Sequence, residues 1–136
     1  MAHVDHFGIS VRDVATSYAQ YVPVLEALGY TEHGQGDLAW FGGPGHVDVL
    51  LYAARDASPE RHAHGRVGWQ HLAYAVHSPE EVDRLHTIAV DAGWSVVRAP
   101  KLYPRFSPRY YASFVEDENG IRLEFAYKPR EELALG

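Results

Sequence analysis

Apolar and polar positions alternate in short runs along this chain, and two longer stretches show helical spacing instead. The strand-like runs are residues 4–11, 30–34, 37–41, 47–52, 69–76, 95–99, 110–116 and 121–127. In residues 14–28 and 79–92 the apolar side chains recur at steps of about three and four, which favours helices. The pattern therefore predicts the element order βαβββ, repeated once.

Residues at the predicted helix ends agree with this reading. Asp13 or Thr16 is a candidate N-cap for the first helix, and Pro79 lies in the first turn of the second. Gly29 and Gly93 follow the two helical stretches, where a glycine commonly ends a helix. Both helices are thus predicted with defined starts and stops.

The repeat gives the domain organisation. The 136 residues are the length of one ordinary domain. We expect one domain over 1–136, with a first module at 4–52 and a second at 68–127. Residues 53–67 are polar and rich in helix breakers, which indicates a linker, and 128–136 form a short tail.

Two histidines occupy equivalent places in the repeat. His6 and His71 are 65 residues apart, each in the first strand of its module. A βαβββ module does not close its own sheet, and a second copy completes it. The sequence therefore predicts an α+β fold in which the two modules form a half-open barrel, with the helices outside and a trough inside.

Strand alternation predicts which side chains face the trough. His6 shares a face with Gly8 and Ser10, whereas His71 shares one with two alanines. Glu124 lies on the polar face of the last strand. The small neighbours leave room for a ligand on this face.

Two imidazoles and one carboxylate suit a divalent first-row metal and leave positions open for substrate. The same residues also have interpretations that need no metal. An isolated strand histidine often only satisfies a core hydrogen bond, and Glu124 alone can be a surface charge. His3 lies on the same face as His6 and is a competing ligand.

Composition narrows the choice of function. The net charge is −6 and the pI about 5.8, which argues against nucleic acid or an anionic membrane as partner. There is no cysteine, so a metal would be held by His, Asp, Glu or Tyr. The first residues lack the pattern of a signal peptide, and no apolar run is long enough to span a bilayer, so we expect a cytoplasmic protein.

The loop KLYPRFSPRYY at 101–111 offers further candidates. Its Arg105 and Arg109 would bind an anionic substrate, unless they are simply solvated. If Glu116 pairs with Ile121 in the last hairpin, Ser113 falls opposite Glu124. Tyr111 then shares the trough face and is a candidate proton donor. Trp40, on a strand of the first module, is a candidate for an aromatic wall, unless it packs in the core.

Three stretches together resemble a known family: HFGISVRDVATSYAQYV…LGY, WQHLAYAV and FVEDENGIRLEF. They resemble the vicinal oxygen chelate superfamily, which includes glyoxalase I, fosfomycin-resistance thiol transferases, extradiol dioxygenases and bleomycin-binding proteins. The resemblance covers about residues 4–127. It implies a metal site at His6, His71 and Glu124, for one divalent ion of zinc, manganese, iron, nickel or cobalt.

The resemblance also implies the chemistry. Members chelate a small substrate through two neighbouring oxygens, as lyases, isomerases or thiol transferases and, in some cases, dioxygenases. Glu124 would then serve as ligand and as base. Some members supply a fourth ligand, but here its position falls near Leu50, which has no donor atom; Asp48, two residues away on the same face, is a possible substitute.

A different class of function is the alternative. Bleomycin-binding relatives use the trough as a metal-free pocket for a large ligand, and they usually lack the full ligand set. The presence of His6, His71 and Glu124 together favours the enzyme. In both cases we expect a small-molecule ligand and a homodimer, because open sheets leave edges to cover.

Overall fold

The computed structural model describes residues 2–45, 47–56 and 60–129. The chain divides into two compact units, Met1–Arg61 and His62–Gly136. The boundary falls within the predicted linker. Linker residues 57–59 and residues 130–136 of the predicted tail lie outside the described residues.

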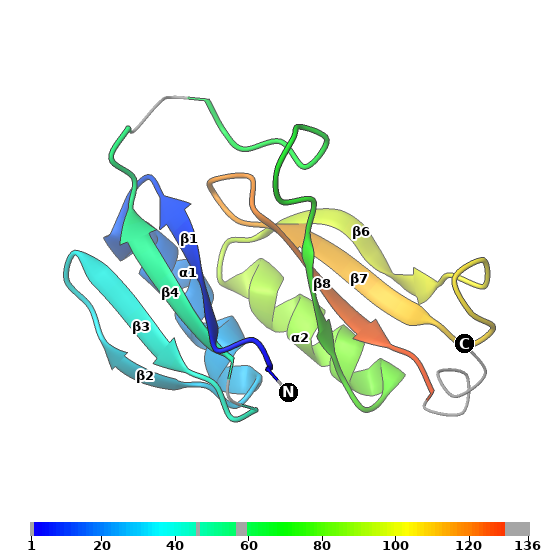
Figure 1. Cartoon of the computed structure of the whole chain (residues 1–136). Helices are drawn as coiled ribbons and strands as arrows, with labels where there is room; N and C mark the ends of the chain where they lie inside the picture. Colours follow the sequence, from blue (N-terminus) through cyan, green and yellow to red (C-terminus); the bar gives the residue numbers. More distant parts are fainter. Residues whose placement is uncertain (1, 46, 57–59, 130–136) are drawn as a thin grey trace. The chain divides into compact units, whose positions relative to one another are not determined.

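The first unit is a four-stranded mixed sheet with one helix (Figure 1). Its elements are β1 (His6–Val11), α1 (Val14–Ala27), β2 (Thr31–Gly34), β3 (Leu38–Gly42) and β4 (Asp48–Ala53). The strand order is β1-β4-β3-β2. The β1–β4 pair is parallel and the other two pairs are antiparallel, so α1 is part of the crossover that returns the chain to β4.

The second unit repeats this arrangement (Figure 1). Its elements are β5 (Leu72–Ala75), α2 (Pro79–Asp91), β6 (Ser95–Leu102), β7 (Tyr111–Glu116) and β8 (Arg122–Tyr127). The order β5-β8-β7-β6 places β8 between a parallel and an antiparallel neighbour. The predicted pair of βαβββ modules is confirmed.

Two strand boundaries differ from the sequence prediction by three residues, whereas the others differ by at most two. β5 begins at Leu72 rather than at residue 69, because its pairing with β8 starts at Leu72 and Leu123. His71 therefore immediately precedes the strand instead of lying inside it. β6 runs on to Leu102, past the predicted end at residue 99, through two register shifts against β7.

The helix starts follow the predicted capping residues. Asp13 caps α1, and its carboxylate accepts from the Ala15 amide at 3.2 Å and from the Thr16 hydroxyl at 2.7 Å. Ser78 caps α2 and accepts from the Glu81 amide at 3.2 Å. These bonds satisfy donors that a helix start leaves without a partner within the helix.

Each helix packs against one face of its own sheet. In the first unit, α1 buries Tyr21, Val24 and Leu25 against Phe41 and Leu51. The buried face of α1 also includes Ser17, whereas the apolar Val22 and Leu28 are only half-buried. None of the helices in the described ranges is long and apolar enough to cross a membrane.

The second sheet carries apolar side chains on both faces. Val115, Leu123 and Phe125 are buried, on the strand positions that face α2. Ala112 and Ala126 form a separate small cluster on the opposite face, with Tyr103. This second cluster lies on the same face as Glu124.

The register of the β7–β8 hairpin differs from the predicted one by one residue. Glu116 pairs with Arg122, so Phe114, and not Ser113, lies opposite Glu124. The cause is the turn, in which the Asp117 amide donates to the Ile121 carbonyl at 3.0 Å and the Asp117 carboxylate accepts from the Ile121 amide at 2.8 Å. Ile121 therefore belongs to the turn and does not pair with Glu116.

Candidate functional site

Glu124 is a buried carboxylate in the middle of the second sheet. It lies on β8, between Ala73 of β5 and Phe114 of β7, and only 3% of its side chain is exposed. A buried carboxylate is costly unless hydrogen bonds or a cation compensate it. The contacts of its two oxygens therefore define the site.

One oxygen of Glu124 meets the histidine that the sequence singles out. The His71 Nε2 lies 3.1 Å from Glu124 Oε1, and 34% of the His71 side chain is exposed. The His71 ring also packs edge-on against Phe114, with ring centroids 5.6 Å apart. The structure thus brings two of the three predicted metal ligands together within one unit.

The other ring nitrogen of His71 is held by the preceding residue. His71 Nδ1 is hydrogen-bonded to the side-chain oxygen of Gln70. An amide oxygen only accepts, so Nδ1 carries a proton, and in a neutral ring Nε2 would present its lone pair to Glu124. Metal-binding histidines are usually oriented in this way.

Tyr110 contacts the second oxygen of Glu124. Its hydroxyl donates to Glu124 Oε2. Burial, together with this hydrogen bond and the negative charge of Glu124, raises the pKa of Tyr110 well above its usual value. The sequence prediction missed Tyr110, because the wrong hairpin register put Tyr111 on the Glu124 face and so assigned the neighbouring Tyr110 to the other face.

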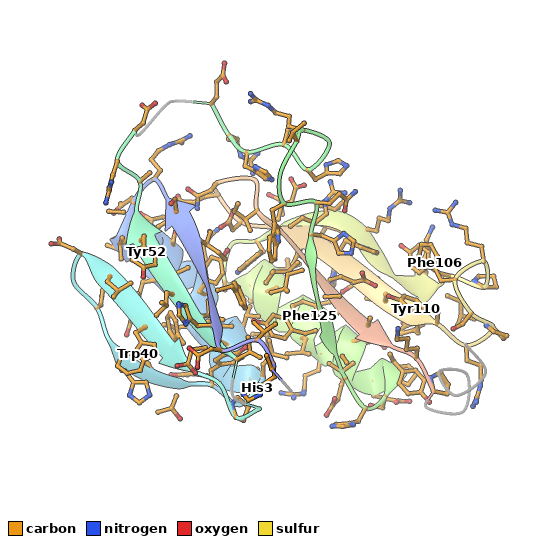
Figure 2. All side chains as sticks on the ribbon, viewed as in Figure 1. His3, Trp40, Tyr52, Phe106, Tyr110 and Phe125 are labelled. Atoms are coloured by element: carbon orange, nitrogen blue, oxygen red, sulfur yellow. The ribbon has the colours of Figure 1, made fainter. Side chains whose placement is uncertain are left out.

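Tyr110 belongs to an aromatic cluster formed with Tyr103, Phe106 and Phe114. Tyr103 stacks on Phe106 at 5.5 Å and meets Phe114 edge-on at 6.0 Å. Tyr110 meets Phe106 edge-on at 5.3 Å, and Figure 2 shows these two side chains close together beside the start of β7. The cluster holds the 103–110 loop beside Glu124.

The predicted basic residues of this loop lie around the cluster. The Arg105 guanidinium lies 5.0 Å from the centre of the Phe106 ring. Arg109 is exposed in the same loop. Their predicted contact with an anionic substrate stays a prediction.

Two predicted site residues lie on the opposite face of the sheet. The Tyr111 hydroxyl donates to Asp83 Oδ1 of α2 at 2.6 Å, which raises the pKa of Tyr111 to about 12. Ser113 is fully buried beside Phe125, and its hydroxyl has no partner among the described residues. Both predictions rested on the wrong hairpin register, so neither residue is placed beside Glu124.

In the first unit, His6 repeats the arrangement of His71. Its Nδ1 lies 2.6 Å from Oδ2 of the preceding Asp5, and 52% of the His6 side chain is exposed. Asp5 and Gln70 stand at the same offset as the two histidines, 65 residues apart. A polar residue before each histidine was therefore a visible signal that the sequence prediction did not use.

The strand register explains why the first unit lacks a counterpart of Glu124. Leu50 pairs with Gly8 of β1 and Trp40 of β3, as Glu124 pairs with Ala73 and Phe114. Leu50 is thus the equivalent of Glu124, as the sequence predicts. A side chain without a donor atom occupies that position.

Asp48, the possible substitute ligand, is already engaged inside the first unit. Its carboxylate accepts from the Gly43 amide at 2.9 Å and from the Trp40 indole at 3.0 Å. The Gly43 bond, followed by the Trp40 bond, holds the pKa of Asp48 below its usual value. Each oxygen of Asp48 thus has a donor of its own.

The first sheet exposes large apolar side chains on the face away from α1. Leu38, Trp40 and Tyr52 are 40–45% exposed there, and Figure 2 shows Trp40 and Tyr52 on this sheet. The Tyr52 ring lies beside Gly8, where a Cβ atom would come within 2.9 Å of it. The space predicted beside Gly8 is therefore filled by Tyr52.

Within either unit, no three His, Asp or Glu side chains of the described ranges lie close enough to hold a metal ion. His71 and Glu124 belong to the second unit, whereas His6 belongs to the first. The complete three-ligand set stays a prediction.

The fold resembles solved structures over nearly the whole chain. A glyoxylase/bleomycin resistance protein/dioxygenase domain from a Frankia species is 23% identical, with a TM-score of 0.77, covering 95% of this chain and 99% of that one. A glyoxalase-related enzyme from Fulvimarina pelagi is 17% identical, with a TM-score of 0.74 and coverages of 95% and 90%. The genomically encoded fosfomycin resistance protein FosX from Listeria monocytogenes is 15% identical, with a TM-score of 0.71 and coverages of 97% and 98%.

Similarity at these identities shows the fold. A search among curated proteins found no significant match. The family model of the Glyoxalase/Bleomycin resistance protein/Dioxygenase superfamily matches residues 3–125. This match covers both βαβββ modules and confirms the resemblance seen in the sequence. The chain therefore belongs to the glyoxalase/bleomycin resistance protein/dioxygenase superfamily.

Proposed function

We propose that this protein is a divalent-metal-dependent enzyme acting on a small substrate with two neighbouring oxygen atoms. One observation carries the proposal: a buried carboxylate oxygen, Glu124 Oε1, faces His71 Nε2 at 3.1 Å. In a neutral ring whose Nδ1 donates to Gln70, the Nε2 lone pair faces a lone pair of this oxygen. A cation between them removes the repulsion.

The separation of these two atoms fits a shared ion. First-row metals bind nitrogen and oxygen ligands at about 2.0–2.2 Å, so two ligands at right angles are about 3 Å apart. The observed 3.1 Å matches that separation. Imidazole and carboxylate are also the donors that zinc, manganese, iron, nickel and cobalt accept.

His6 is the proposed third ligand. Its Nδ1 is engaged by Asp5, which leaves Nε2 as the coordinating nitrogen, as in His71. The first module that supplies His6 belongs either to the same chain or to a second copy. No fourth protein ligand is expected, because Leu50 has no donor atom and Asp48 is engaged by Trp40 and Gly43.

The roles of the residues follow from their positions. The bound ion supplies Lewis-acid stabilisation of the negative charge that develops on a substrate oxygen. His71 and Glu124 would hold the ion, and in an isomerase-type reaction Glu124 would also accept a proton from the substrate. Arg105 or Arg109 would bind an anionic group of the substrate, whereas Tyr111 takes no part.

Metal analysis tests this proposal. The protein is purified without a polyhistidine tag, and its metal content is measured by mass spectrometry. We expect one divalent ion per site in the wild type and its loss in His6→Ala, His71→Ala and Glu124→Ala. His77→Ala, an exposed histidine six residues after His71, is the control and should keep the ion. A wild type that takes up no stoichiometric ion contradicts the proposal.

A second candidate is a metal-free binding protein for a large aromatic ligand. The exposed Leu38, Trp40 and Tyr52 on one face of the first sheet favour it. In that case Glu124 and a protonated His71 form an ion pair that needs no metal. Quenching of Trp40 fluorescence by such a ligand in metal-free protein, with no effect of His71→Ala, supports this candidate.

A further inference from the structure

The two oxygens of Glu124 have different partners. Glu124 Oε2 accepts from the Tyr110 hydroxyl, whereas Oε1 faces His71 Nε2. A glutamate carboxylate turns readily about its last bond, because this torsion has only broad minima. Something must therefore fix which oxygen points toward His71.

Tyr110 is itself firmly held. Its amide donates to the Ser107 carbonyl at 3.2 Å, and its carbonyl accepts from the Tyr103 amide at 2.8 Å. Its ring packs edge-on against Phe106 and Tyr103, at 5.3 and 6.4 Å between centroids. Backbone and ring contacts together fix the hydroxyl at the end of this side chain.

We propose that Tyr110 is a positioning residue that occupies Glu124 Oε2 and leaves Oε1 as the single oxygen for the metal ion. This inference rests on the proposed function. With only 3% of Glu124 exposed, water does not readily replace a lost hydrogen bond. A carboxylate that binds through one oxygen also uses one coordination position rather than two. The second position is then open to a substrate that binds through two oxygens.

The same aromatic cluster contains a matched control. The Tyr103 hydroxyl is buried and interacts with the Arg98 side chain, but it makes no hydrogen bond to Glu124. Tyr103→Phe and Tyr110→Phe therefore remove the same atom from neighbouring rings. Only the second change removes a contact with Glu124.

The experiment titrates metal-free wild type, Tyr110→Phe and Tyr103→Phe with Co²⁺ by calorimetry, and records the visible spectrum of each Co²⁺ complex. We expect Tyr110→Phe to weaken Co²⁺ binding about 10- to 100-fold, the usual effect of losing a contact that orients a ligand. Its spectrum should also change, because the carboxylate then binds differently. Tyr103→Phe should keep the affinity and spectrum of the wild type.

Each result decides a different point. Unchanged affinity and spectrum in Tyr110→Phe overturn the role of Tyr110 and leave the metal site standing. Equal losses in both variants also overturn it, since ring packing would then be the cause. A wild type that binds no Co²⁺ overturns the proposed function and the inference with it.

A crystal structure of the Co²⁺-loaded wild type gives a readout that does not depend on a variant folding. Coordination through Oε1 alone, with Tyr110 still on Oε2, supports the inference. Coordination through both oxygens overturns it.

Discussion

The residue before each candidate histidine matters as much as the histidine itself. Asp5 holds Nδ1 of His6, and Gln70 holds Nδ1 of His71. Such contacts set which ring nitrogen carries the proton, and thus which nitrogen is available to a metal. The repeat therefore extends to the residues that orient the candidate ligands.

We expect Gln70→Ala to weaken metal binding about tenfold, and Asp5→Ala to do the same, because such contacts typically contribute at least this factor. Calorimetric titration of metal-free protein with Zn²⁺ measures the change. Asp37→Ala removes an exposed carboxylate from the turn between β2 and β3 and is the control. Wild-type affinity in both Asp5→Ala and Gln70→Ala contradicts the assigned role.

Tyr111 gives a pH-dependent prediction. Its hydrogen bond to Asp83 raises its pKa from 10.0 to about 12. The folded state thus holds this proton more tightly than the unfolded state, so the stabilisation is complete below pH 10 and is lost as the pH rises through about 12. In urea unfolding across this pH range, we expect the free energy of unfolding of Tyr111→Phe to fall less steeply with pH than that of the wild type. The control is Tyr127→Phe, opposite Tyr111 in the hairpin, which should keep the wild-type slope.

Ser113 is expected to contribute nothing to ligand binding or to stability. Its buried hydroxyl has no partner among the described residues, and a buried unpaired hydroxyl costs free energy. Ser113→Ala should therefore leave the melting temperature unchanged or raise it, and leave metal affinity unaltered. A clear drop in metal affinity would return Ser113 to the candidate site.

At the scale of elements, the β7–β8 turn determines which residues lie beside Glu124. The Asp117 carboxylate accepts a hydrogen bond from the Ile121 amide and so keeps Ile121 in the turn. The strand pairing is therefore shifted by one residue from a hairpin in which Glu116 pairs with Ile121. Side chains alternate along a strand, so a shift of one residue moves each partner to the other face. Phe114 consequently replaces Ser113 opposite Glu124.

Gly120, in this turn, is a position where a side chain would destabilise the fold. Gly120 has a φ of +83°, and a Cβ there would lie 2.1 Å from the His62 carbonyl oxygen. Gly34 also has a positive φ, but nothing lies within 4 Å of its Cβ position. We expect Gly34→Ala to lower the free energy of unfolding by about 1–3 kcal/mol from backbone strain alone. Gly120→Ala should cost clearly more, measured by urea unfolding, and equal losses would show that the contact with His62 is unimportant.

At the scale of the whole molecule, each sheet has two edge strands, β1 and β2 in one and β5 and β6 in the other. Edge strands present unpaired backbone groups, which proteins usually cover. We expect a homodimer, with a sedimentation coefficient that falls on dilution if the dimer is weak. A monomer at every concentration tested would contradict this expectation.

The elements were largely predictable, because strand alternation, helical spacing and capping residues are local properties of the sequence. The repeat then linked His6 with His71, and it also placed Leu50 as the counterpart of Glu124. Local patterns are weaker at strand ends, and there the predictions for β5 and β6 were wrong. The prediction put Tyr110 on the wrong face, because alternation gives the correct face only when the hairpin register is known.

The sequence by itself determined two βαβββ modules, their helix ends, the superfamily, and the choice of His71 and Glu124 as candidate ligands. These follow from periodicity, from residue type and from the repeat. Only the tertiary structure decided that His71 Nε2 meets Glu124 Oε1, that Tyr110 holds the other oxygen, and that Tyr111 faces α2 instead. The physical reason is that the hairpin register follows from hydrogen bonds within one turn, and loop packing from contacts between residues far apart in the sequence; periodicity encodes neither.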